Sequence, residues 1–246
     1  MGKETNPISL VVDIDQTLAG GVVEVHMHYY NQLLGLNMTD QAIQAAKKFR
    51  KTFDVPEIMG YRDPEDPSLR EKQEAAFQEA RAKIRTSPEV HLDLQTLPGS
   101  RDGVETLLTT LAEVQDLSYY TVRPHEVKDA TQDWLKKHNY PNPENVVICD
   151  SPEDKLKRII TNLVLSKPEE ERGSVLLVDD SLKDLNMAAE KIANDPEYSD
   201  GLKYIVLIGF GNTEHVEGTF YPSTGLRVLS LPSWDQQSIE DVVARI

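Results

Sequence analysis

The stretch Ile8-Ser9-Leu10-Val11-Val12-Asp13-Ile14-Asp15-Gln16-Thr17-Leu18 decides the fold of this 246-residue chain. Its first five residues, four of them apolar, are typical of a parallel strand that is buried on both faces. Asp13 and Asp15 follow where such a strand leaves its sheet, which is the edge where open α/β sheets bind ligands. Because two carboxylates at one edge repel each other, we expect a cation to hold them, and Mg²⁺ prefers such oxygen ligands.

Further strands alternate with helices in the second part of the chain. Apolar runs predict strands at 117–122, 146–149, 174–179, 204–208 and 228–231. Amphipathic segments between most of them, and one at the end of the chain, predict helices of about 10 to 15 residues. This alternation predicts an α/β fold with a doubly wound, mainly parallel sheet.

The segment 22–97 interrupts this alternation, because it contains no buried-strand pattern. Helices are expected at 22–34, from Asp40 onward with Ile43, Ala46 and Phe49 on one face, and from Asp66 to about residue 85. We therefore expect a core of residues 1–21 and 98–246, with residues 22–97 as a small α-helical domain. The alternative is a helical layer that packs on the core for structural reasons alone.

Composition excludes several classes of protein. The formal net charge of −15 disfavours a broad nucleic-acid surface or an anionic membrane as partner. The single cysteine, Cys149, follows an apolar run, so it is expected in the core and no disulfide can form within the chain. No segment is long and apolar enough to span a membrane, and the N-terminus lacks the apolar region of a signal peptide, so a cytoplasmic protein is expected.

Two further strand ends carry groups that suit a phosphate ligand. Thr121 lies near the end of a predicted strand, and its hydroxyl can donate to a phosphoryl oxygen. Arg123 follows, and a guanidinium can bind such an oxyanion at two points. Lys155 lies in a predicted first helical turn, where a cation opposes the helix dipole unless an anion is near. Lys157 is the alternative for the same role.

Asp179 and Asp180 end another buried strand, and Asp184 follows one helical turn after Asp180. Side chains at this spacing can meet on one face of a helix. Carboxylates that converge there with Asp13 require a metal ion, which again favours Mg²⁺.

In chain order, the acid pair, Tyr120-Thr121-Val122-Arg123-Pro124, the lysine and the acidic triad resemble the four motifs of the haloacid dehalogenase-like (HAD) phosphohydrolases, over about residues 8 to 210. The resemblance implies that Asp13 is the nucleophile, which becomes an aspartyl phosphate. It implies that Asp15 is the general acid and base and lends its backbone carbonyl to Mg²⁺. Thr17, in the same first motif, is expected at the substrate.

The later motifs imply the remaining roles. Lys155 would fix the negative charge of nucleophile and phosphate. Asp180 would bind Mg²⁺ directly and Asp184 through water, whereas Asp179 stands where many members have glycine. That departure leaves open which acid of the pair touches the metal. The helical segment 22–97 resembles a cap at the first insertion point of the family, and capped members act on small molecules.

We therefore expect a Mg²⁺-dependent phosphomonoester hydrolase acting on a small phosphorylated metabolite, with a nucleotide-like ester favoured over a sugar phosphate by Arg123 and the Asp179-Asp180 pair. The alternatives are a phosphotransferase or mutase on the same scaffold and a non-catalytic HAD-like binding protein. A signalling receiver domain fits less well, because its lysine comes last along the chain, whereas here an acidic cluster comes last.

Overall fold

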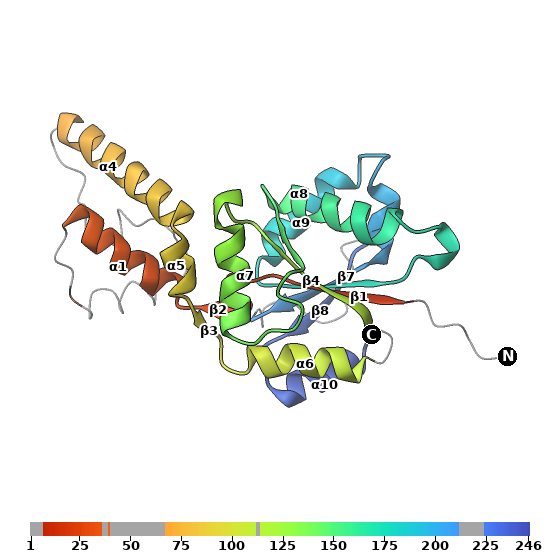
Figure 1. Cartoon of the computed structure of the whole chain (residues 1–246). Coiled ribbons are helices and arrows are strands. Elements are labelled where there is room, and N and C mark those ends of the chain that lie inside the picture. The colour runs from red at the N-terminus through yellow and green to blue at the C-terminus, as the bar shows by residue number, and fades with distance from the viewer. Residues whose placement is uncertain (1–6, 36–38, 40–66, 112–113, 212–223) are drawn as a thin grey trace.

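The computed structural model describes residues 7–35, 39, 67–111, 114–211 and 224–246. Within these ranges the chain forms a six-stranded sheet in the order β5-β4-β1-β6-β7-β8, and every neighbouring pair is parallel (Figure 1). The expected α/β class with a mainly parallel sheet is confirmed. The strands are β1 (Ile8–Val12), β4 (Val114–Thr121), β5 (Val146–Ile148), β6 (Val175–Asp179), β7 (Ile205–Phe210) and β8 (Arg227–Leu231).

Strand β1 lies inside the sheet, between β4 and β6, and all of its residues are buried. This explains why its sequence is apolar on both faces. Val12 pairs with Tyr119 of β4 and with Val178 of β6. Because the strands are parallel and in this register, the residues that follow each of them meet at one edge of the sheet.

Helices cover both faces of the sheet and close two apolar cores. On one face, α6 (Ser100–Thr110), α7 (Lys128–Lys137) and α10 (Gln236–Val243) pack in the core that contains Trp134 and Trp234. On the other face lie α8 (Pro152–Ile159), its π-helical continuation η2 (Ile160–Leu165) and α9 (Leu182–Ile192). Short 3-10 turns complete the layers: η1 (His125–Val127), η3 (Glu169–Glu171) and η4 (Ser199–Tyr204).

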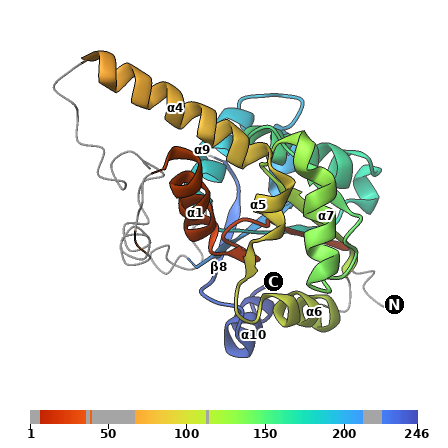
Figure 2. The ribbon, with the colours of Figure 1, turned by 60° about the vertical axis from the view of Figure 1, so that its left-hand side comes forward.

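A separate group of helices, α1 (Val22–Leu34), α4 (Pro67–Thr86) and α5 (Pro88–Leu92), stands beside the sheet and is called the helical insertion below (Figures 1 and 2). It has its own apolar cluster, in which the rings of Tyr30 and Phe77 stack at 5.2 Å. A two-stranded antiparallel ribbon, β2 (Ala19–Gly20) with β3 (Gln95–Thr96), links it to the core. The helix expected from Asp40 onward lies outside the described residues.

The insertion is anchored at its base on α7. The indole nitrogen of Trp134 donates to the carbonyl of Leu94 at 2.8 Å, and the ammonium of Lys137 donates to the carbonyl of Leu92. The chain leaves β1 through Asp13 and Asp15, then passes through β2 into α1. The insertion is therefore attached at the edge of the sheet where the polar strand ends meet (Figure 1).

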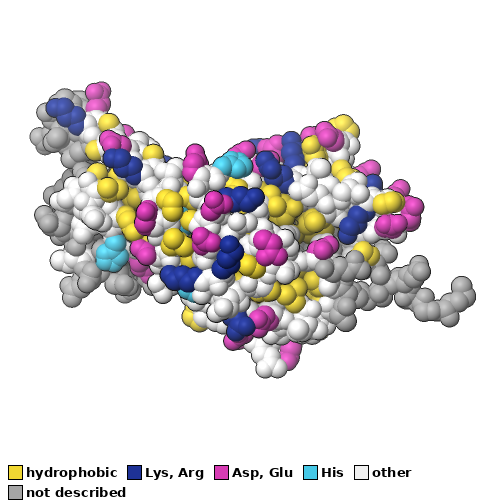
Figure 3. Space-filling model, in the orientation of Figure 1, with side chains coloured by type: hydrophobic (Ala, Val, Ile, Leu, Met, Phe, Trp, Pro, Cys, Tyr) yellow, Lys and Arg dark blue, Asp and Glu magenta, His cyan; other side chains and the backbone are white. Residues whose placement is uncertain are grey.

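The surface shows no strongly basic region on the face drawn in Figure 3, where acidic and basic side chains of the described residues are interspersed. Cys149 is a buried free thiol, as expected. In the described part of the chain, no helix combines the length and the apolar character needed to cross a membrane.

Candidate active site

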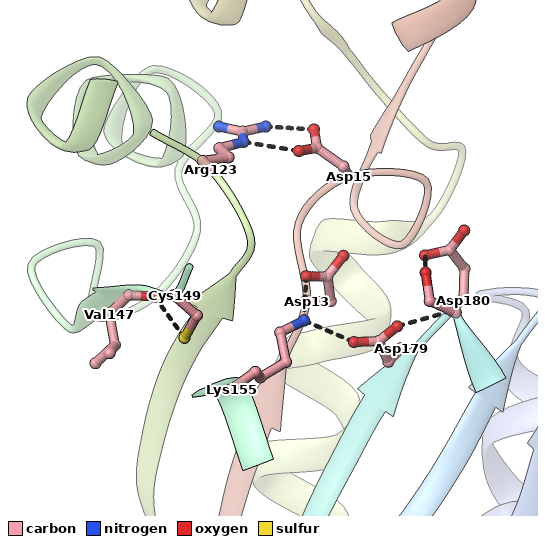
Figure 4. A network of polar contacts seen from close by, with 9 residues as sticks. Asp13, Asp15, Arg123, Val147, Cys149, Lys155, Asp179 and Asp180 are labelled. Carbon is pink, nitrogen blue, oxygen red and sulfur yellow. Dashed lines mark hydrogen bonds and ion pairs between the residues drawn. The ribbon is translucent and has the colours of Figure 1, made fainter. Parts of the chain in front are cut away.

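A buried lysine joins two strand ends at the centre of the site. The ammonium of Lys155 donates to Oδ1 of Asp13 at 2.6 Å and to Oδ2 of Asp179 at 2.7 Å (Figure 4). The side chains of Lys155, Asp13 and Asp179 are 3%, 8% and 2% exposed. Burial alone would lower the pKa of Lys155, but the two carboxylates raise it above its ordinary value. Lys155 is therefore a cation held permanently between two acids.

Local structure explains why this lysine reaches the site. Helix α8 begins at Pro152, after Ser151, whose hydroxyl caps the helix by accepting from the backbone N–H of Asp154 at 3.1 Å. Lys155 then falls in the first turn, and its cost against the helix dipole is offset by the acids it binds. Lys157 points elsewhere, since it is half-buried and pairs with Glu153 and Asp195. The structure thus brings Lys155, and not Lys157, to the strand ends.

Three carboxylates meet at this edge in a group fit for a cation. Asp13, Asp179 and Asp180 each offer an oxygen within 4.8 Å of the others. Burial raises the pKa of Asp13 well above its ordinary value, although Lys155 opposes the shift. Burial, and next the neighbouring Asp179, raise the pKa of Asp180 to about 7. A single ammonium does not neutralise three acids, so a hard divalent cation would relieve the remaining repulsion.

The structure separates the acids that the sequence grouped together. Oδ1 of Asp179 accepts the backbone N–H of Ser181 at 2.7 Å, and its Oδ2 accepts from Lys155. Both oxygens of Asp179 thus accept short hydrogen bonds, whereas Oδ1 of Asp180 accepts a longer one from the hydroxyl of Ser181 at 3.4 Å, and this difference favours Asp180 as the direct metal ligand. Asp184 lies in the first turn of α9 with an exposed side chain, and it is not part of the three-carboxylate group.

Asp15 is engaged in a different contact, which the sequence did not predict. Its two oxygens accept from Nε and Nη2 of Arg123 at 2.8 and 2.5 Å, and Figure 4 shows its carboxylate turned toward that arginine. Nη1 of Arg123 donates to Oγ1 of Thr131 at 2.9 Å. Burial would raise the pKa of Asp15, but Arg123 lowers it to about 2, so Asp15 is an anion here.

The two threonines of the candidate site are both buried. Thr121 is the last residue of β4 and is 1% exposed. Thr17 is fully buried, and its hydroxyl has no hydrogen-bond partner among the described residues. The backbone carbonyl of Thr17 accepts from the indole nitrogen of Trp234 at 2.7 Å, which ties the loop after β1 to the C-terminal part of the chain. An unpaired buried hydroxyl is costly, so Thr17 requires an explanation beyond packing.

Two histidines of the helical insertion interact with Asp15, and sequence reasoning assigned neither to the site. His26 lies on α1 and His91 on α5, and both contribute to the electrostatic environment of Asp15. Burial lowers the pKa of His26 to about 4 and also lowers that of His91, so both rings are neutral at pH 7. Neither residue lies in a motif; from the sequence, His26 could either line the insertion side of the pocket or pack within the insertion, with the second favoured.

Known structures share this fold. No protein-family model and no curated protein matches the sequence. A HAD-superfamily hydrolase of subfamily IA from Geobacter sulfurreducens matches over 99% of each chain, with a TM-score of 0.53 and 13% identity. YfnB of Bacillus subtilis, whose structure contains magnesium, matches over 98% of this chain and 99% of its own, with a TM-score of 0.54 and 12% identity. The chain therefore has the fold of the HAD-superfamily hydrolases.

Proposed function

We propose that the chain is a Mg²⁺-dependent phosphomonoester hydrolase that acts on a small phosphorylated metabolite, with a nucleotide-like ester as the first candidate. The observation that carries the proposal is the contact of Lys155 with both Asp13 and Asp179, beside the three-carboxylate group. It supports the proposal because a carboxylate that could act as nucleophile, a buried cation and a group of acids that could bind a metal ion lie together at the edge of the sheet where α/β folds bind ligands.

In this proposal Asp13 attacks the phosphorus of the substrate and forms an aspartyl phosphate. Lys155 holds the attacking carboxylate in place and offsets the charge of the phosphoryl oxygens. The hydroxyls of Thr17 and Thr121 donate to the substrate. Asp15, once it has left Arg123 and taken up a proton from solvent, gives that proton to the leaving oxygen, and it then removes one from the water that hydrolyses the aspartyl phosphate.

The acids of this site have the oxygen ligands that a magnesium ion prefers. Asp13 and Asp180 would hold Mg²⁺, with Asp179 at its side, the backbone carbonyl of Asp15 as a further ligand and Asp184 reached through water. When bound, Mg²⁺ would supply charge neutralisation for the attack on a phosphoryl group. YfnB, which shares the fold, has been solved with magnesium.

We further propose that the helical insertion is a cap, within a small domain of residues 22–97. It has its own apolar cluster, it joins the core through the ribbon β2–β3, and its residues His26 and His91 act electrostatically on Asp15. A cap at this place would close over the substrate and exclude water from the reacting groups.

Hydrolysis of p-nitrophenyl phosphate tests the proposed function, with native chain and Asp13→Asn, each with and without Mg²⁺. The expected result is metal-dependent release of p-nitrophenol that Asp13→Asn abolishes. Release that is undiminished in Asp13→Asn would contradict the assignment of the nucleophile. If folded chain that binds Mg²⁺ turns over neither p-nitrophenyl phosphate nor a panel of phosphorylated metabolites, either the cap rejects every probe or the site is used only for binding. Transfer of the phosphoryl group to an alcohol instead of water would identify a phosphotransferase or mutase.

A further inference from the structure

The contact between Asp15 and Arg123 joins two groups that the proposed mechanism needs apart. Arg123 is predicted to bind a phosphoryl oxygen, yet two N–H groups of its guanidinium, at Nε and Nη2, donate to Asp15. Asp15 is predicted to exchange a proton with the leaving oxygen and with water, yet both its oxygens face the guanidinium. While this two-point contact persists, neither group has its predicted partner.

We propose that Arg123 holds Asp15 in a parked position, and that a phosphoryl oxyanion releases Asp15 by taking its place on the guanidinium. The inference rests on the proposed function and adds a control step to the same site. No covalent bond changes in this step, because one oxyanion replaces another on the same donors. Binding of the phosphate group and release of Asp15 thereby become one event.

The partners of Arg123 show which of the two side chains would move. The Arg123 side chain is 1% exposed, and its guanidinium also donates to the hydroxyl of Thr131, which donates in turn to the carbonyl of Val127. Arg123 therefore stays in position without Asp15. The side chain of Asp15 is 32% exposed and hence has room to turn.

The loop that carries Asp15 is a tight turn, in which the backbone N–H groups of residues 17, 18 and 19 all donate to the carbonyl of Ile14. Gln16 follows with a φ of 62°, in the left-handed region that a non-glycine residue rarely adopts. The chain then continues through β2 into the helical insertion. Release of Asp15 is therefore a rotation of its side chain alone, whereas a movement of Arg123 would break its hydrogen bond to Thr131 of α7.

Binding of inorganic phosphate to the Mg²⁺-loaded full chain tests this inference by calorimetric titration of native, Asp15→Asn, Arg123→Gln and the double variant. If Asp15 occupies Arg123 in about nine molecules of ten or more, its removal strengthens phosphate binding about tenfold or more. In the Arg123→Gln background the same removal has no effect, since there is no guanidinium to compete for. Arg101→Gln is the matched control, because it removes an exposed arginine that pairs with Glu105.

An equal gain from Asp15→Asn in both backgrounds would overturn the inference, because it would show only the loss of a repelling charge. If Asp15→Asn strengthens phosphate binding in neither background, the inference is overturned as well. If phosphate still binds through Arg123 in that case, the proposed hydrolase function is unaffected. Absence of phosphate binding in all variants would count against both. If Arg123→Gln does not fold, as judged by circular dichroism, Arg123→Lys takes its place, since it retains the charge but not the two-point geometry.

Discussion

Replacement of Lys155 by methionine tests the charge balance of the site. The variant keeps an unbranched side chain of similar length but removes the ammonium that lies 2.6 Å from Asp13 and 2.7 Å from Asp179. Loss of one partner from a buried ion pair costs about 3–5 kcal/mol in the free energy of unfolding. For a chain of this length that corresponds to a fall in Tm of about 6–20 °C.

Lys157→Met is the matched control, because it removes the same group from the same helix two residues further on. The Lys157 side chain is 31% exposed and its carboxylate partners lie at 3.1 and 3.6 Å. Ion pairs that remain in contact with solvent contribute little to stability. Calorimetry of unfolding in a chelator should therefore show a much larger loss for Lys155→Met than for Lys157→Met.

Magnesium provides the second part of this test. In Lys155→Met the three acids have lost their fixed cation, so Mg²⁺ should raise the Tm of this variant by more than it raises that of the native chain. At 100 times its Kd a bound ion adds about 2.7 kcal/mol to the free energy of unfolding. Equal stabilities of the two lysine variants, or no larger gain from Mg²⁺ in Lys155→Met, would refute the reasoning.

Three further predictions concern the acids, the buried hydroxyl and one histidine. Asp180→Asn should weaken Mg²⁺ binding by more than Asp184→Asn does, as measured by calorimetric titration, because Asp184 lies outside the three-carboxylate group. Thr17→Val should leave the free energy of unfolding unchanged or raise it by up to about 1 kcal/mol, yet lower kcat/KM about tenfold; unchanged kcat/KM would place Thr17 outside the reaction. Because His26 has a folded pKa of about 4 against an ordinary value of 6.5, the unfolded chain binds the proton first, so Tm falls as the pH is lowered between these values. His26→Gln should flatten that fall, and a parallel Tm profile would contradict the burial of His26 as its cause.

The sheet and the polar groups at its edge follow from the sequence. Parallel strands that are buried on both faces are continuous apolar runs, and the acid that ends each run must lie at the edge where the chain leaves the sheet. Asp13, Thr121 and Asp179 could be placed in this way. Lys155 could be placed because a lysine in a first helical turn needs an anion nearby.

The remaining contacts depend on distances that only the fold determines. Arg123 and Asp15 are separated by 108 residues, and the turn after β4 decides that this guanidinium meets a carboxylate rather than solvent. The sequence marks Thr131 only as a helical residue, and its contact with Arg123 arises when α7 packs on the sheet. The spacing of Asp184 after Asp180 allowed them to share a face, but α9 begins at Leu182 and directs the Asp184 side chain to solvent.

The two-residue strands β2 and β3 were also missed. Strands of this length carry no alternation of apolar and polar residues, so pattern reasoning cannot find them. The π-helical end of α8 could not be predicted either, because its apolar residues continue the α-helical spacing of the preceding turns. These features arise from packing between distant segments rather than from local preference.

The central claim is that Asp13 is the nucleophile, and covalent trapping tests it most directly. Native chain turning over p-nitrophenyl phosphate with Mg²⁺ would be quenched in acid, digested and mapped by mass spectrometry, with Asp13→Asn treated in parallel. The account predicts a phosphoryl group on the peptide that contains Asp13, at that residue, and none in the variant. Steady turnover with the phosphoryl group on another residue, or turnover by Asp13→Asn at the native rate, would contradict it.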